Sequence, residues 1–409
     1  MRHTIVMVAT SYPRFPGDGV GSFMEPIAKS VAARGHDVHL VAPWHPLITR
    51  GRSEDGVTFH FYRYAPVRAL NVFGYAGGMR ADTTLRASAW LAAPLALAAG
   101  WLTARRVAAR HRATILHGHW VIPGGVMAAG ARRGRPLVIS LHGSDVYVAE
   151  RHEILRHAAR SAFERAGWVT ACSDDLRERA IALGADPAAI ETVPYGVDTA
   201  RFAPSPDRRQ RVRAALGVGD APLVFSAGRL VRKKGFEYLI DAASLLRAKI
   251  PGVRVVIAGA GDLGTELEQR ARAAGGVVTL VGAKSQDEIG ELAAAADVVA
   301  VPSVHDDDGN VDGLPNFALE AMATATPVVA SRVGGLPQAI EDGLTGRLVP
   351  ERNAAALANV IESLLGDPGS ARRLGEAARS DVARRFSWPA AAERFEYAYE
   401  RAGDRHRQR

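Results

Sequence analysis

Two acidic residues eight positions apart, Asp312 and Glu320, flank a Gly-Leu-Pro turn. Gly313 and Pro315 disfavour a regular helix, which places Asp312 in a loop. Asn316 is suited to cap a following helix that carries Glu320 in its first turns. A loop carboxylate, a helix carboxylate and the backbone N–H groups between them can bind a polyhydroxylated, anionic ligand. The alternative is a solvated turn residue and an exposed helix residue, because surface carboxylates are common.

A basic segment lies where a predicted strand over residues 223–227 gives way to a predicted amphipathic helix. Arg229 and Lys234 stand in this junction, where the free N–H groups of the helix add positive potential. A planar guanidinium and a compact ammonium can together neutralise a diphosphate leaving group. A run of basic residues can equally form a solvated loop, and that is our expectation for Arg232 and Lys233.

Polar side chains also follow two predicted strands in the first half of the chain. His119 comes after the run 114–116, and His142 and Asp145 come after the run 137–141. The carboxyl ends of parallel strands meet at one edge of a sheet, so these side chains can converge there. Histidines can bind metals, but no Cys ligands and no close His-x3-His spacing accompany them. We therefore expect no metal ion, and structural histidines are the alternative at each position.

The first forty residues predict a strand, a glycine loop and a helix, over 4–9, 11–21 and 23–33. Such a junction presents the first N–H groups of the helix to a phosphate. Gly19 and Gly21 allow close approach of the backbone, although their spacing is not the dinucleotide fingerprint and a plain turn is the alternative. The opening apolar run is too short for a signal peptide, so we expect a first buried strand.

The stretch 302–331, which contains Asp-Gly-Leu-Pro-Asn-Phe-Ala-Leu-Glu, resembles the acid-x7-acid block of glycosyltransferase family 4. The members of this family are retaining nucleotide-sugar transferases of the GT-B fold. The segment 228–235 resembles their Gly-Arg-Leu-x-x-x-Lys-Gly motif, and 17–23 resembles their glycine loop. Many members carry Glu where this sequence has Asp312. The resemblance covers nearly the whole chain and is loosest over 44–112.

This resemblance implies an α/β architecture of the GT-B type, with two Rossmann-like domains whose parallel sheets face each other across a central cleft. We expect an acceptor-binding domain over 1–200 and a nucleotide-sugar-binding domain over 201–385. Residues 386–409 would form a helix that crosses back to the first domain, followed by a disordered basic tail. A chain of 409 residues is long enough for two such domains.

The resemblance also assigns roles. The implied catalytic residues are His142, Asp312, Glu320, Arg229 and Lys234. The implied donor-binding residues are Gly19, Gly21, Arg229, Lys234, Gly282, Leu314, Pro315, Asn316, Phe317 and Glu320. On the acceptor side the candidates are His119 and Asp145. No metal and no cofactor are implied. The implied donor substrate is a nucleoside diphosphate sugar of the UDP or GDP type.

The implied reaction is retaining transfer of a sugar to a hydroxyl of a carbohydrate or lipid-linked acceptor, in cell-envelope polysaccharide or glycolipid synthesis. Two alternatives keep the fold. One is an isomerase similar to the nucleotide-sugar 2-epimerases, and the other is a non-catalytic nucleotide-binding protein, which the Asp312 departure favours. Fold by itself does not decide among them.

The net charge of +8 favours anionic partners, but the arginines are dispersed and no nucleic-acid module is present, so we expect no nucleic-acid partner. The single Cys172 excludes an internal disulfide and fits a reducing, cytoplasmic location. Residues 89–102 form an apolar stretch too short to span a bilayer. It is either a core helix or a helix that lies on an anionic membrane surface at the inner face. Arginines flank this stretch at positions 80, 86, 105, 106 and 110.

Overall fold

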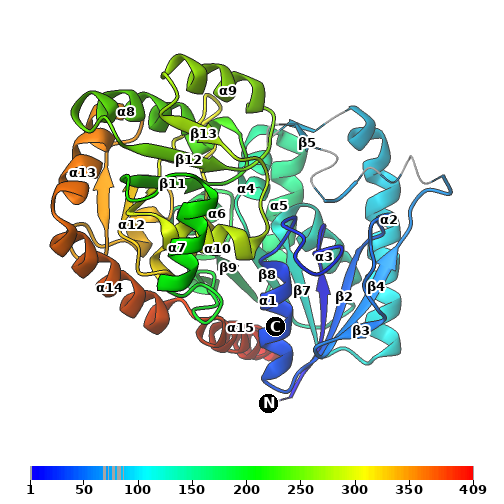
Figure 1. Ribbon diagram of the computed structural model, residues 1–409. Coiled ribbons are helices and arrows are strands. Elements are labelled where there is room, and N and C mark those ends of the chain that lie inside the picture. The colour runs from blue at the N-terminus through cyan, green and yellow to red at the C-terminus, as the bar shows by residue number, and fades with distance from the viewer. Residues whose placement is uncertain are drawn as a thin grey trace. The chain divides into compact units, whose positions relative to one another are not determined.

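The computed structural model describes residues 2–67, 71, 73–75, 79–80, 84–85 and 87–408, with the backbone alone at 79–80, 84–85 and 87–90. The side chains of Arg80 and Arg86, which flank the apolar stretch, lie outside this description. The chain divides into two compact units. The first unit comprises Met1–Pro194 and Trp388–Arg409, and the second comprises Tyr195–Ser387 (Figure 1).

The first unit is built on an eight-stranded sheet of order β10-β9-β8-β7-β1-β2-β4-β3, parallel except for the pairing of β3 with β4. The strands are β1 Thr4–Val8, β2 Asp37–Pro43, β3 Ser53–Glu54, β4 Val57–Tyr62, β7 Ile115–His119, β8 Leu137–Leu141, β9 Trp168–Ala171 and β10 Ile190–Thr192. A separate antiparallel pair is formed by β5 Met79–Arg80 and β6 Thr84–Leu85.

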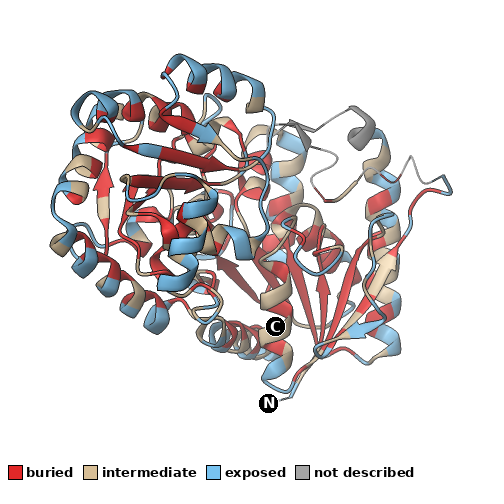
Figure 2. Ribbon diagram, viewed as in Figure 1, coloured by how far each residue is buried: buried red, intermediate tan, exposed pale blue. Residues whose placement is uncertain are grey.

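Helices alternate with these strands and cover the sheet. They are α1 Met24–Ala33, α2 Ala87–Arg110, α3 Val126–Ala131, α4 Ser144–Arg151, α5 Glu153–Arg165, α6 Asp174–Ala182 and α15 Trp388–Gln408. Helix α1 packs on α15, and α2 packs on α3. Strands β1, β7 and β8 are buried along almost their whole length (Figure 2). Burial on both faces explains why β1 and β8 are mostly apolar without alternation, whereas β7 also buries His117 and His119.

The second unit holds a six-stranded, fully parallel sheet of order β13-β12-β11-β14-β15-β16. Its strands are β11 Leu223–Ala227, β12 Arg254–Ala258, β13 Val278–Leu280, β14 Val298–Val301, β15 Val328–Ser331 and β16 Arg347–Val349. Its helices are α7 Pro206–Ala215, α8 Phe236–Lys249, α9 Gly264–Ala273, α10 Gln286–Ala295, α11 Asn316–Ala323, α12 Leu336–Ala339, α13 Ala354–Gly366 and α14 Pro368–Arg385. Two α/β units with parallel sheets confirm the predicted fold class.

Helix α8 shows how the apolar pattern sets the packing of the second unit. Five apolar residues repeat along one face of the helix, as expected for a helix that packs on a sheet. All of them are buried in the core with the strands: Phe236, Leu239, Ile240, Ala243 and Leu246. The buried face holds the start of α8, and the basic residues before it, at the carboxyl end of β11.

The predicted disorder of the basic tail is wrong, because α15 continues to Gln408. Arg405 pairs with Asp186 at 2.7 Å, and Arg407 pairs with Asp404 one turn earlier at 2.6 Å. Cations in the last turn also interact favourably with the carbonyl end of the helix. These contacts keep the end of the chain helical, and α15 belongs to the same unit as residues 1–194.

Within the described residues, no helix is both long enough and apolar enough to cross a membrane. Helix α2 contains the apolar stretch, and it spans 24 residues with Pro94 inside. One face of α2 is buried at four-residue intervals. The residues of this face are Ala96, Gly100, Ala104 and Ala108. The helix is therefore a core helix on that side.

Gly235 precedes α8 in the left-handed region, with φ of 63°, and an added Cβ would overlap the carbonyl oxygen of Pro302. We expect Gly235→Ala to lower the free energy of unfolding by about 3 kcal/mol, because the strained φ and the clash both act against the folded state. Denaturant unfolding measures this change.

A matched control is available at Gly366, the last residue of α13, where an added Cβ meets nothing within 4 Å. Gly366→Ala should change the free energy of unfolding by less than about 1 kcal/mol. Equal losses in the two variants would contradict the role of Gly235.

Candidate functional site

The acidic loop and the basic loop predicted from the sequence meet in the second unit. Lys234 Nζ lies 2.5 Å from Asp312 Oδ2, and Lys233 Nζ lies 3.2 Å from Asp312 Oδ1. The three side chains are between 11% and 18% exposed. We call them the Lys-Asp-Lys cluster. The structure thus brings together two predicted residues, Asp312 and Lys234, that are 78 positions apart in the sequence.

The prediction that Lys233 is a solvated loop residue is wrong, since its ammonium takes part in this buried cluster. Arg232, by contrast, has a side chain that is 40% exposed and pairs with Glu266 and Glu237. It remains a surface residue, as predicted. The chain turns at Gly235, and the Val304 N–H donates a hydrogen bond to the Lys233 carbonyl at 2.9 Å. These two features fix the turn in which the Lys233 side chain points to Asp312 and the Arg232 side chain points to the surface.

The loop that carries Asp312 is ordered by its own hydrogen bonds. Asp306 Oδ1 accepts from the backbone N–H groups of Asp308 and Asn310, at 3.0 and 2.8 Å. His305 Nδ1 lies 2.9 Å from Glu351 Oε1. The acidic run at 306–308 therefore shapes a turn.

The two predicted acids have opposite protonation tendencies. Burial acts to raise the pKa of Asp312, but Lys234 and Lys233 more than offset it and hold that pKa well below its usual range. Burial raises the pKa of Glu320 to about 7, although Arg201 and Lys234 act to lower it. Asp312 is therefore ionised near neutral pH, whereas Glu320 takes up a proton readily. The alternative interpretation, in which Asp312 is a solvated turn residue and Glu320 an exposed helix residue, is therefore wrong.

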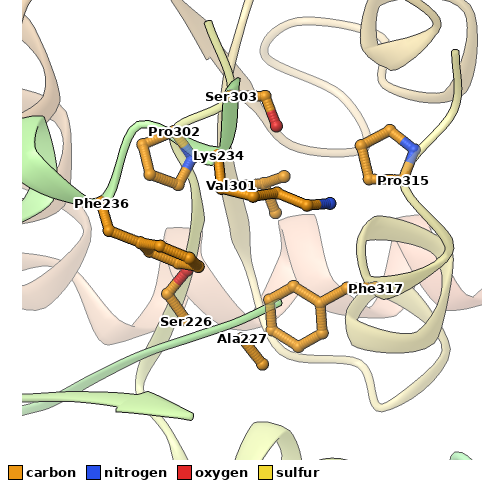
Figure 3. Close-up of a pocket in the computed structure, with 9 residues that line it drawn as sticks. All are labelled: Ser226, Ala227, Lys234, Phe236, Val301, Pro302, Ser303, Pro315 and Phe317. Carbon is orange, nitrogen blue, oxygen red and sulfur yellow. The ribbon is translucent and has the colours of Figure 1, made fainter. Parts of the chain in front are cut away.

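A pocket lies beside the cluster, between the ends of β11 and β14 and the start of α11 (Figure 3). Its lining comprises Ser226, Ala227, Lys234, Phe236, Val301, Pro302, Ser303, Pro315 and Phe317. Within the described chain, Ser303 Oγ and Asn316 Oδ1 are buried and make no hydrogen bond. Buried polar atoms are almost always satisfied, so these two are suited to contact a polar ligand.

Asn316 does not cap α11, and that prediction is wrong. The helix begins at Asn316 itself, and Pro315, with φ of −64° and ψ of 117°, occupies the capping position without a side-chain hydrogen bond. The Asn316 side chain is thereby left available at the start of the helix. Leu314 and Phe317 are buried, and Phe317 packs edge-on against Phe225 with ring centroids 5.6 Å apart.

Three loops at the carboxyl edge of this sheet are bonded to one another. Leu230 N–H donates to Ala260 O at 3.0 Å, and Gly259 N–H donates to Gly282 O at 2.8 Å. Gly282 has φ of 71°. Arg229, in the loop after β11, is exposed and lies in the field of the Asp312 and Asp262 carboxylates. The structure therefore gathers the predicted residues of the second unit at one sheet edge.

A second group of predicted residues gathers at the carboxyl ends of β7 and β8 in the first unit. His119 Nδ1 and His142 Nε2 lie 3.1 Å apart, and their rings are stacked. Burial lowers the pKa of both imidazoles, which keeps them neutral. The predicted convergence of His119, His142 and Asp145 is confirmed. His119 is the last residue of β7, which extends past the predicted end at 116.

Asp145 organises the loops of this group. Its carboxylate accepts hydrogen bonds from the backbone N–H groups of Val121, Gly143 and His142, at 2.7, 3.0 and 3.2 Å. Burial raises its pKa to about 6, and these bonds oppose that rise. With both oxygens engaged, Asp145 holds His142 in place.

Two aromatic residues that sequence reasoning missed surround His142. The rings of Phe23 and Trp120 each lie with their centroids 4.8 Å from the His142 ring. Phe23 directly precedes α1, and Trp120 directly follows β7 with φ of 61°. The only signal in the sequence is their position beside the glycine loop and beside His119.

The predicted glycine loop is ordered by Asp18, which accepts from the Arg14 and Val20 backbone N–H groups and pairs with the Arg14 guanidinium at 2.6 Å. Gly21 has φ of 66°, and a Cβ there would press on Ser11. At Gly19 a Cβ would meet nothing within 4 Å. The conformation of the loop therefore requires glycine at position 21, whereas position 19 has space for a side chain.

Comparisons with known proteins find matches to both halves of the chain. The family model "Glycosyl transferases group 1" matches residues 208–381, and the model "Glycosyltransferase Family 4" matches residues 17–201. A Mycolicibacterium smegmatis relative, GDP-mannose-dependent alpha-(1-6)-phosphatidylinositol monomannoside mannosyltransferase, is 37% identical over 263 residues. This match covers 64% of this chain and 68% of the relative.

Two solved structures match the chain over nearly its whole length. Sucrose-phosphate synthase from Thermosynechococcus elongatus aligns with a TM-score of 0.80 and 23% identity, over 98% of this chain and 100% of that one. The Anabaena protein HepE in complex with UDP aligns with a TM-score of 0.77 and 22% identity, over 97% and 99%. These likenesses confirm the GT-B fold.

Proposed function

The chain belongs to the group 1 glycosyltransferases of family 4, and from this premise we propose that it transfers a hexosyl group from a nucleoside diphosphate sugar to a hydroxyl, with retention of configuration. The observation that carries the proposal is the Lys-Asp-Lys cluster beside a pocket. The unsatisfied Ser303 Oγ belongs to the pocket lining, and the unsatisfied Asn316 Oδ1 lies at the start of α11. Lysine ammonium groups held at a helix start are suited to bind a diphosphate.

The chemistry assigned to these residues follows from where charge develops. As the bond from the anomeric carbon to the β-phosphate breaks, negative charge accumulates on the leaving diphosphate. Lys234 and Arg229 stabilise that charge from fixed positions. Asp312 compensates the two lysines before the donor binds and orients the sugar afterwards. Glu320 accepts hydrogen bonds from the ribose hydroxyls.

The acceptor side of the reaction is assigned to the first unit. The neutral His142 ring, fixed by Asp145 and flanked by Phe23 and Trp120, is suited to pack on the reacting sugar and to accept or donate one hydrogen bond. We propose attack on the same face of the anomeric carbon as the leaving group. NMR of the first-formed product reports the anomer, and an inverted product would contradict this mechanism.

The donor nucleotide is proposed to be of the UDP or GDP type. The name of the mycobacterial relative specifies GDP-mannose, and HepE was solved with UDP. The acceptor is proposed to be a lipid-linked or envelope carbohydrate, because the same relative acts on a phosphatidylinositol monomannoside. Uracil and guanine present different hydrogen-bond donors and acceptors, so the protein should bind one of the two nucleotides in clear preference.

Calorimetric titration with UDP, GDP and ADP, without added metal, tests the proposal. We expect one nucleotide to bind in preference, and its sugar conjugates to support transfer in the presence of a chelator. Binding by none of the three would remove the proposed function. Activity lost on chelation and restored by manganese would contradict metal independence, and conversion of the sugar nucleotide without an acceptor would indicate an isomerase.

We also propose that the protein is cytoplasmic and rests on the anionic inner face of the membrane through α2. Opposite the buried face of this helix, Leu91, Leu95 and Leu102 are 82%, 60% and 37% exposed. At 3.6 residues per turn they lie on one side of the helix. Arg106 and Arg110, both exposed, lie beside them. An apolar stripe edged with arginines is typical of helices that lie in the headgroup layer.

The double variant Leu91→Ser, Leu95→Ser should bind phosphatidylglycerol vesicles about 10-fold more weakly, because two apolar side chains no longer enter the interface. Vesicle flotation measures the bound fraction. Ile154→Ser is the control, since Ile154 is 79% exposed on a different helix, α5. Unchanged flotation of the double variant would contradict membrane binding through α2.

A further inference from the structure

Three histidines gather in the first unit, apart from the residues assigned to the transfer reaction. His39 lies in β2, His60 lies in β4, and His111 directly follows α2. One ring nitrogen from each lies within 4.8 Å of the others. The closest pair is His39 Nδ1 and His60 Nε2, at 3.1 Å. We call this set the three-histidine cluster.

The topology of the unit explains why the three side chains meet. In the parallel pairing of β2 with β4, His39 is opposite Thr58 and Val41 is opposite His60, so both histidines project from the same face of the sheet. Helix α2 packs on β2 and β4 and ends at Arg110. The chain then turns at Arg112, with φ of 50°. The His111 ring contacts the His39 ring, with centroids 3.9 Å apart.

The ring nitrogens are placed as ligands of a transition metal would be. Imidazole nitrogens bind zinc at about 2.0–2.1 Å, which puts two of them about 3.3 Å apart on a tetrahedral ion. The His39–His60 separation already has nearly this value, and a ring nitrogen of His111 lies within 4.8 Å of both. The other nitrogen of His39, Nε2, lies 3.2 Å from Asp37 Oδ2. A carboxylate on the second nitrogen is the usual support of a metal-binding imidazole.

Some charges near the three-histidine cluster oppose a bound cation, and others favour one. Arg52 and Arg110 lie within electrostatic range of the cluster and oppose a cation. Asp37 and the carbonyl groups at the end of the 24-residue α2 favour one. His39 is buried, whereas His60 and His111 are partly exposed, so an ion has a path to the site.

We propose that the three-histidine cluster binds a divalent transition metal ion of the zinc type, with His39 through Nδ1, His60 through Nε2 and a ring nitrogen of His111. Asp37 is the positioning residue. The ion joins two strands to the end of α2 and stabilises the first unit. This inference goes beyond the proposed function, because it concerns a site outside the transfer reaction, which is proposed to need no metal.

The test uses untagged full-length protein that has been treated with a chelator and desalted. Titration with Co²⁺ should give one equivalent bound, with the visible absorption of a four-coordinate site, and Zn²⁺ should displace it. Zn²⁺ should also raise the unfolding temperature. Asp37→Asn should weaken Co²⁺ binding about 10- to 100-fold, as expected for loss of a supporting carboxylate. His60→Gln and His111→Gln should weaken it further.

His157→Gln is the control, since His157 lies on α5 and its side chain is 73% exposed. It should leave Co²⁺ binding unchanged. Equal Co²⁺ binding by the His111→Gln, Asp37→Asn and control proteins would overturn the proposal, and so would no rise in the unfolding temperature of the wild type with Zn²⁺. Asp37 is largely at the surface, with a side chain 43% exposed, so its variant tests the site even where a histidine variant fails to fold. Nucleotide titration of the same samples reports the proposed function separately.

Discussion

Lys234→Ala is expected to weaken binding of the preferred nucleoside diphosphate about 10- to 100-fold and to slow transfer. A hydrogen bond to a charged group contributes about 1.5–3 kcal/mol, and a factor of ten in affinity corresponds to about 1.4 kcal/mol. Removal of a fixed donor to a developing charge costs a further 10²- to 10³-fold in kcat. Calorimetry and initial rates measure the two effects.

The fold should survive this substitution. Lys233 lies 3.2 Å from Asp312 Oδ1 and continues to neutralise the carboxylate, so no unpaired charge is left buried. Lys249→Ala is the matched control, because Lys249 belongs to the same unit but pairs with Glu362 at the far end of α8, with a side chain 51% exposed. Equal losses of nucleotide affinity in the two variants would contradict the assignment of Lys234.

Asp312→Asn is expected to change nucleotide affinity in the direction opposite to Lys234→Ala. Removing its negative charge takes away a carboxylate that competes with the diphosphate for the lysine ammonium groups, so affinity for the free nucleotide should rise. Transfer should fall, because the sugar loses the carboxylate that orients it. If nucleotide affinity falls in Asp312→Asn as it does in Lys234→Ala, the cluster is structural and does not bind the diphosphate.

The strands were predictable where their residues are uniformly apolar. The runs 137–141 and 223–227 coincide with β8 and β11. The sequence predicts β7 too short, because histidine at position 117 is typical of a polar loop. In the structure His117 is buried in the strand, where Ser140 Oγ lies 2.7 Å from Nε2 and Tyr399 Oη lies 2.9 Å from Nδ1. A satisfied polar residue can occupy a core position, and its partners are distant in the sequence.

The role of Lys233 could not be derived from local sequence for a similar reason. Residues 232–234 form a single 3-10 turn, in which successive side chains point about 120° apart. Nothing in three consecutive basic residues tells which ones face the interior. The answer depends on Asp312, which follows 79 residues after Lys233.

The three-histidine cluster is the group of residues that local sequence patterns are least able to predict. Its members are separated by 21 and 51 positions, without a metal-binding spacing. They meet because the register of β2 with β4 and the end of α2 bring them together. Local patterns predict elements well, whereas clusters built from several elements require the tertiary structure.

Glu320→Gln is expected to weaken nucleotide binding and also to remove its pH dependence. The pKa of Glu320 is raised to about 7 by burial, so the carboxyl of the nucleotide-free protein is largely protonated at pH 6. A carboxylate is the better acceptor for ribose hydroxyls. Wild-type affinity should therefore rise by up to about tenfold per pH unit below pH 7 and level off above it. Calorimetry from pH 5.5 to 8.5 should show this slope in the wild type and a flat profile in the variant.

The stability of the wild-type protein should fall with rising pH, whereas its nucleotide affinity should rise. The folded-state pKa of Glu320 lies above the ordinary value of 4.5, so the folded protein holds a proton that the unfolded chain releases. The free energy of unfolding of the wild type therefore falls as pH rises from about 4.5 to about 7. Asp312 has a lowered pKa and contributes stability that is lost only at acidic pH, equally in both proteins. Glu320→Gln should thus gain about 3 kcal/mol relative to the wild type between pH 4.5 and pH 8. A variant that binds nucleotide more weakly yet resists denaturant better at pH 8 identifies Glu320 as a binding group kept at a cost in stability. Loss of both properties would instead identify a structural residue.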